Sequence, residues 1–121
     1  MTNIDPTAKI GKNVTMDDSV VIQNGVYIGN DCTFGKKVVI EKKTVIGDGV
    51  KLGDGCVIEK HVNIGNDCVF GTKVVIEKQT IVGKSVTMGD NIVIEKNVTI
   101  LDNTMLSSDT VIEAGNTFPE E

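Results

Sequence analysis

The chain has 121 residues, of which 40% are hydrophobic and only 3% aromatic, and its net charge is −5. This length suits one domain, and the acidic balance argues against nucleic acid and anionic membranes as partners. No apolar run approaches the roughly 20 residues that a membrane-spanning helix needs, and the first residues do not resemble a signal peptide. Three cysteines, an odd number, exclude a full disulfide framework. We therefore expect a reduced, cytoplasmic protein.

An apolar residue recurs every six positions through the whole chain. The series shows no register slip and comprises Ile4, Ile10, Met16, Ile22, Ile28, Phe34, Ile40, Ile46, Leu52, Ile58, Ile64, Phe70, Ile76, Val82, Met88, Ile94, Ile100, Leu106, Ile112 and Phe118. Neither a helix nor a long alternating strand gives a period of six. Two positions before most members stands a small or β-branched residue, on the same side of an extended segment. Each hexapeptide is therefore predicted to be a short strand with two inward side chains, followed by a corner.

The predicted corners carry residues that suit tight bends. Glycine follows the inward residue in many hexapeptides, and two positions later stand Asn13, Asp31, Gly49, Asp67 and Asn103, which tolerate a positive φ. A longer phrase, VVIEK at residues 74–78, returns in variants every 18 residues, so three hexapeptides make one triangular coil. Successive coils would stack as parallel strands about 4.8 Å apart. We predict an all-β solenoid of about six coils on that geometry, without inserted loops.

Several hexapeptides resemble the bacterial transferase hexapeptide repeat: residues 28–33 (IGNDCT), 46–51 (IGDGVK) and 64–69 (IGNDCV). Residues 4–11 (IDPTAKIG) resemble the first coil of the acyltransferases of that family. The resemblance implies a left-handed parallel β-helix, whereas the general preference for right-handed crossovers would predict the opposite hand. We expect a single domain over residues 1–121, with end-capping residues at 1–6 and 117–121. There Pro119 and the glutamates after it would blunt the exposed strand edges.

The three cysteines, Cys32, Cys56 and Cys68, all fall in the inward position two residues before the apolar series. Cys32 and Cys68 would lie on one face two coils apart, roughly 10 Å, which is too far for a disulfide. We interpret all three as core residues. The alternative is a reactive or metal-binding thiol. Burial in an apolar core weighs against it, because burial opposes ionisation of the thiol.

One corner carries a column of like charges, which would stack one coil apart. The carboxylates are those of Glu41, Glu59, Glu77, Glu95 and Glu113, and the neighbouring column contains Lys42, Lys60, Lys78 and Lys96. We predict a solvated charge ladder, in which each exposed pair contributes little to stability. A divalent metal along the carboxylates is the alternative. Because no ligand of a second type converges there, we predict no metal and no cofactor.

One outward strand position is valine in six successive coils: Val21, Val39, Val57, Val75, Val93 and Val111. The outward positions of the other two faces are mixed, and their scattered threonines do not suit an ice-binding surface. A flat apolar patch of a few hundred Å² usually marks an interaction surface, although β-propensity alone could produce such a file. We predict that the chain associates with itself through these valines. The resemblance implies a homotrimer.

His61 is the only histidine, and we expect it at an outward corner between Lys43 and Gln79 of the neighbouring coils. The resemblance implies a His general base that activates an acceptor toward an acyl thioester such as acetyl-CoA, bound between subunits. In that family the His usually comes with a substrate-binding loop or further polar residues, which this chain lacks. We therefore favour a self-associating structural scaffold without catalytic activity. The alternative is a homotrimeric acyl-CoA-dependent acyltransferase with His61 as its base.

Overall fold

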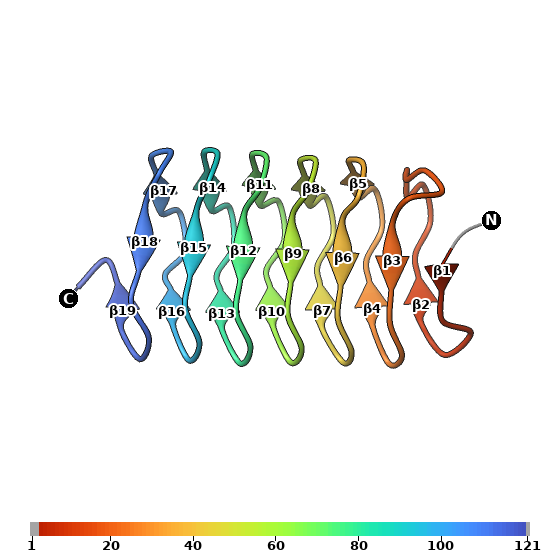
Figure 1. Cartoon of the computed structure of the whole chain (residues 1–121), viewed down its shortest axis with the longest axis horizontal. Helices are drawn as coiled ribbons and strands as arrows, with labels where there is room; N and C mark the ends of the chain where they lie inside the picture. The colour runs from red at the N-terminus through yellow and green to blue at the C-terminus, as the bar shows by residue number, and fades with distance from the viewer. Residues whose placement is uncertain (1–2, 121) are drawn as a thin grey trace.

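The computed structural model describes residues 3–120, so the first two residues and the last residue of the predicted end caps lie outside the described range. All regular structure in this range is β-strand, arranged as a parallel solenoid (Figure 1). In Figure 1 the front strands run downward while the chain advances from right to left, so the coils wind left-handedly. The predicted left-handed parallel β-helix of about six coils is confirmed. Residues 3–120 contain no helix that could cross a membrane.

Three parallel sheets form the sides of the triangle, and neighbouring strands pair with an offset of 18 residues. Sheet 1 contains β1 (Asn3–Ile4), β3 (Val21–Ile22), β6 (Val39–Ile40), β9 (Val57–Ile58), β12 (Val75–Ile76), β15 (Val93–Ile94) and β18 (Val111–Ile112). Sheet 2 contains β2 (Lys9–Ile10), β4 (Tyr27–Ile28), β7 (Val45–Ile46), β10 (Asn63–Ile64), β13 (Ile81–Val82), β16 (Thr99–Ile100) and β19 (Thr117–Phe118). Sheet 3 contains β5 (Thr33–Phe34), β8 (Lys51–Leu52), β11 (Val69–Phe70), β14 (Thr87–Met88) and β17 (Met105–Leu106).

The six-residue apolar series forms the core of the prism. Every member from Ile22 to Ile112 is buried, and Ile4, Ile10, Met16 and Phe118 near the two ends are partly buried against the same core. Register explains this uniform burial, because each inward side chain rests on its equivalents one coil before and one coil after. For example, Ile58 pairs with both Ile40 and Ile76. The core is therefore one continuous column, mostly aliphatic, with Phe34 and Phe70 as its buried aromatic residues.

Three kinds of corner join the sheets. Corner 1 leads from sheet 1 to sheet 2 (for example residues 41–43), corner 2 from sheet 2 to sheet 3 (47–49), and corner 3 from sheet 3 back to sheet 1 (53–55). Apart from Thr7 and Ser19 near the start of the chain, the third corner residue has a positive φ, which confirms the bends predicted at Asn13, Asp31, Gly49, Asp67 and Asn103. The same conformation occurs at residues that the sequence did not single out, namely Lys37, Lys43, His61, Lys73, Gln79, Ser85, Asn91, Asn97 and Asp109.

In corners 2 and 3 the backbone amide of the second corner residue donates a hydrogen bond to a side chain of the following coil. Asp54 Oδ1 accepts the Lys36 amide at 2.8 Å, and Asp90 Oδ1 accepts the Thr72 amide at 2.8 Å. The coils approach closely at these corners, which explains the glycine in the first corner position. A Cβ on Gly53 would lie 2.5 Å from the carbonyl oxygen of Gly71 and 3.0 Å from the Thr72 nitrogen.

Both prolines stand at positions whose equivalents in other coils donate an amide to a neighbouring coil. The amide equivalent to Pro119 in earlier coils donates to the following coil, as Leu101 does to the Phe118 carbonyl at 2.9 Å. The amide equivalent to Pro6 in later coils donates to a side chain of the preceding coil, as Lys42 does to Gln23 Oε1 at 3.2 Å. We propose that Pro6 and Pro119 help to cap the two ends, because neither has a backbone N–H to leave unpaired.

Alanine at Gly53 tests the close approach of the coils. We expect Gly53→Ala to lower the free energy of unfolding by about 1–3 kcal/mol, as overpacking usually does. Glu77→Ala is the matched control, since Glu77 is the first residue of corner 1 and already carries a Cβ there. We expect its effect to stay within about 0.5 kcal/mol. Urea denaturation followed by circular dichroism measures both, and equal losses would contradict the proposed packing at corner 3.

Candidate functional site

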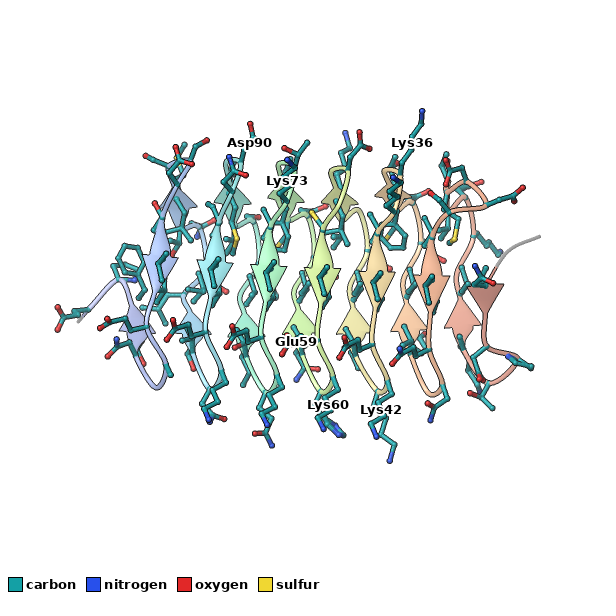
Figure 2. The ribbon with its side chains drawn as sticks, in the orientation of Figure 1. Lys36, Lys42, Glu59, Lys60, Lys73 and Asp90 are labelled. Carbon is teal, nitrogen blue, oxygen red and sulfur yellow. The ribbon has the colours of Figure 1, made fainter. Side chains whose placement is uncertain are left out.

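The valine file (Val21, Val39, Val57, Val75, Val93 and Val111) runs along the outer surface of sheet 1, which faces the viewer in Figures 1 and 2. Five of its members are half-buried rather than fully exposed, because in-register valines of the neighbouring coils cover their flanks. Only Val111, on the last strand of the sheet, is 57% exposed. More exposed apolar side chains lie on sheet 2, where Tyr27 is 54% and Ile81 50% exposed. The file is therefore a continuous but shallow apolar strip.

The charge ladder lies along corner 1, beside the valine file, where Figure 2 labels Glu59, Lys60 and Lys42. Glu41, Glu59, Glu77 and Glu95 are half-buried, and Glu113 is exposed. Some of these carboxylates bond backbone amides of the following coil: Glu59 Oε1 accepts the Lys78 amide at 3.2 Å, and Glu95 Oε1 accepts the Ala114 amide at 3.1 Å. The column thus also provides amide acceptors. Sequence reasoning missed this role, although the absence of glycine from the first position of corner 1 was a signal of a different corner design.

His61 lies in corner 1 between Lys43 and Gln79, as expected, and its side chain is exposed. Its φ is 58°, and its amide donates to the Lys42 carbonyl at 3.1 Å. Lys43, Gln79 and Asn97 adopt the same positive φ in this column. Histidine is enriched among the residues that tolerate this conformation. The bend therefore accounts for the placement of His61 without a chemical role.

Within residues 3–120, four of the surface hollows have volumes of about 170 to 450 Å³, and His61 lines none of these four. One lies at each end of the prism, beside β18 and β19 and beside β1 and β3. A third lies at corner 3 and a fourth between β2 and β4. Within residues 3–120 no group of three or more His, Cys, Asp or Glu side chains is arranged to hold a metal ion.

The three cysteines are free and fully buried in the core. Each thiol donates to a corner carbonyl of the following coil: Cys32 to Gly47 at 3.2 Å, Cys56 to Gly71 at 3.2 Å and Cys68 to Gly83 at 3.1 Å. The buried hydroxyl groups of Thr44 and Thr80 make equivalent bonds to the Glu59 and Glu95 carbonyls, at 2.8 and 3.0 Å. Burial raises the pKa of all three thiols. The cysteines therefore act as small core residues with a weak hydrogen-bond donor.

A family model for the GMPPB C-terminal domain matches residues 1–111 of the chain. The chain belongs to the GMPPB C-terminal domain family. The hexapeptide-repeat resemblance is also confirmed at the level of the fold by structural neighbours of the chain, one of which is a hexapeptide transferase family protein from Anaplasma phagocytophilum. That protein gives a TM-score of 0.61 at 18% identity, with 92% of this chain and 78% of that chain covered. No curated protein matches the chain by sequence.

Two further structural neighbours of the chain are acetyltransferases. The acetyltransferase domain of PglB from Neisseria gonorrhoeae gives a TM-score of 0.79 at 15% identity, with 94% of this chain and 52% of that chain covered. The H141N mutant of perosamine N-acetyltransferase from Caulobacter crescentus, in complex with CoA and GDP-perosamine, gives 0.71 at 14% identity, with 89% and 50% covered. The chain thus spans about half the length of these two proteins. At such identities the likeness shows the fold alone.

The buried thiols predict a loss of stability at alkaline pH. An unfolded thiol ionises near pH 8.5, whereas burial raises the pKa of Cys32, Cys56 and Cys68 in the folded chain. The unfolded state then releases protons that the folded state retains, so stability is full below about pH 8.5 and falls as pH rises further.

Urea denaturation between pH 7 and 9.5 measures this loss. We expect it to disappear in the triple Cys→Val variant, because valine already occupies equivalent inward positions such as Val38 and Val74. An equal alkaline loss in that variant would show that other groups cause it. The native thiols should also resist a thiol reagent such as dithionitrobenzoate until urea unfolds the chain.

Proposed function

We propose that the chain is an assembly module that associates with itself through the valine file and has no catalytic site of its own. The observation that carries this proposal is the unbroken valine file on sheet 1. Charged corner residues lie on both sides of it, such as Lys73 on corner 3 and Glu59 and Lys60 on corner 1 (Figure 2). An apolar strip with a polar rim is the usual anatomy of a protein interface. Strand propensity does not explain the file, since the outward positions of sheet 2 include Lys9 and Asn63.

The size of the strip supports a closed ring over a simple pair. Six valines at about 4.8 Å spacing form a strip roughly 25 Å long, and five of them are half-buried within the chain. Such a strip offers a few hundred Å², which is less than the roughly 800 Å² per partner of a standard interface. Around a three-fold axis each copy contacts two neighbours through two different surfaces, so area beside the strip adds to the buried area per copy. A homotrimer is therefore the assembly that we propose.

Lysine substitutions in the middle of the file test the interface. We expect Val57→Lys with Val75→Lys to convert the assembly to a monomer, because each new charge would have to be desolvated in the contact. The inward neighbours Ile58 and Ile76 stay unchanged, so the β spectrum should be retained. Sedimentation velocity at tens of micromolar measures the mass.

The matched control places the same charges on the other two sheets. Val45 on sheet 2 and Val69 on sheet 3 are each 43% exposed. We expect Val45→Lys with Val69→Lys to leave the mass unchanged. A monomeric unsubstituted chain, or dissociation by both double variants alike, would show that the valine file is not the interface.

The second candidate function is acyl transfer with His61 as general base, which the likeness to two acetyltransferase structures favours. The surroundings of His61 weigh against it. A general base acts within hydrogen-bond reach of its acceptor, and catalysis needs oriented groups around it. His61 is exposed on a bend, and its neighbours in the column are the flexible side chains of Lys43 and Gln79.

Titration with CoA and acetyl-CoA separates the two functions. We expect no CoA affinity better than about 1 mM, a level at which binding contributes only about 4 kcal/mol, and no thiol release with amine or sugar acceptors. His61→Asn is the suitable variant, because Asn97 already adopts the same positive φ in this column. Micromolar CoA binding, with thiol release that His61→Asn abolishes, would establish the enzyme instead.

We also propose a cytoplasmic location. The three cysteines are free and buried, and their odd number prevents complete pairing. Free structural thiols are typical of compartments that keep thiols reduced. Recovery of the chain with unmodified thiols from the cytoplasmic fraction of its source cells would be consistent with this location, and a secreted chain would contradict it.

A further inference from the structure

The hollow at corner 3 has a volume of about 430 Å³ and contains more lysine than any of the other three. Its lining consists of Lys36, Lys37, Asp54, Gly55, Thr72 and Lys73. These residues come from three successive coils of corner 3. Figure 2 shows Lys36 and Lys73 on the same edge of the prism, with Asp90 one coil beyond Lys73.

Gly55 leaves the space between two of these lysines empty. It occupies the third position of corner 3, as Lys37 does one coil before it and Lys73 one coil after it. Lys37 and Lys73 are therefore two coils apart, or roughly 10 Å. Its φ is 72°, and a Cβ there would approach Lys73 Cγ only to 3.6 Å and the Lys73 nitrogen to 4.0 Å. Packing therefore does not demand glycine at this position. At Gly49, by contrast, a Cβ would lie 2.6 Å from Asp67 Oδ1.

The charges around the hollow favour an anion. Three lysines face one carboxylate, that of Asp54, whose Oδ1 already accepts the Lys36 amide at 2.8 Å. Lys36 also faces the preceding coil: hydrogen bonds from Ser19 lower the pKa of Asp17, and Lys36 adds to the effect. Asp18 lies on that coil and Asp90 on the coil after Lys73. The lining itself therefore carries three lysines and one carboxylate, a local excess of positive charge in a chain whose net charge is −5.

We propose that this lysine slot, formed by Lys37, Gly55 and Lys73 with Lys36 and Thr72 beside them, binds a small diphosphate. Lysine ammonium groups bind phosphate oxygens as point charges, and their aliphatic stems form the walls of the slot. Two linked phosphate groups match two ammonium groups two coils apart better than a single phosphate does. The Thr72 hydroxyl supplies a further donor. The site belongs to a single chain, so it does not depend on the assembly proposed above.

Calorimetric titration of the full chain with sodium pyrophosphate at low ionic strength tests the slot. We expect saturable binding that weakens steeply with added salt, because exposed charges are screened. Lys37→Gln with Lys73→Gln should weaken it roughly tenfold, as the loss of two exposed charge contacts implies. Lys12→Gln with Lys84→Gln, which changes two lysines of corner 2, is the matched control and should leave binding unchanged. An equal loss of pyrophosphate affinity in both double variants would show general charge attraction and would overturn the proposed site.

A second pair of variants fills the slot at constant charge. Asn91 adopts a positive φ in the same column as Gly55, so Gly55→Asn should fold and should weaken pyrophosphate binding several-fold. Gly115→Asn is its control, since Gly115 has a φ of 79° and open space around it. Unchanged binding in Gly55→Asn would place the anion elsewhere.

Two further ligands define what the slot recognises. Inorganic phosphate should bind more weakly than pyrophosphate, and equal affinity would exclude recognition of two linked groups. Adenosine diphosphate then distinguishes a free diphosphate from one carried on a nucleoside, and a loss of its binding in Lys37→Gln with Lys73→Gln would support the same slot. The absence of saturable pyrophosphate binding to the unsubstituted chain would overturn the proposal.

Discussion

The fold depends on one constraint, that each residue lies beside the residue 18 positions later. Outward strand residues donate their amides to the following coil, as Val57 does to the Val74 carbonyl at 2.9 Å and Val75 to the Ile92 carbonyl at 2.8 Å. A coil with one extra residue would break this register and turn its inward side chains outward. Throughout residues 3–120 the coils therefore keep one length, and the same positions face the core in each of them.

The corners meet this constraint in two different ways, because a bend leaves amides that the strand ladders do not satisfy. In corners 2 and 3 the acceptor comes from the following coil, as with Asp54 and the Lys36 amide. In corner 1 it comes from the preceding coil, as with Glu59 and the Lys78 amide. The glutamate column thus has a backbone role that mutual attraction with the lysine column does not explain. Since exposed ion pairs contribute little, the amide bonds are the stronger reason for glutamate at positions 59 and 95.

Periodicity predicted the strands, the inward residues and the tight corners that carry glycine, because these follow from geometry that repeats unchanged in every coil. It did not predict the positive φ of Lys37, Lys73 and Gln79, since their side chains have no strong preference for that conformation and the stacked coils impose it. Nor did it predict the partner of Glu59 or the half-burial of the valines. Both depend on the path of the neighbouring coils in space, and the sequence pattern does not specify that path.

Because stacking fixes the inward residues and restricts the corners, function has to be carried by the outward strand positions and the corner side chains. A residue pattern on this surface is evidence for a function to the extent that it departs from what stacking of the coils requires. The column of His61 also accepts Lys43, Gln79 and Asn97, so a single histidine there is a weak signal. Valine at the outward position of six of the seven strands of sheet 1 is a regularity that stacking does not require, since the other sheets place polar residues at the equivalent positions. Gly55 is a smaller departure of the same kind, because it leaves space where the fold would accept a side chain.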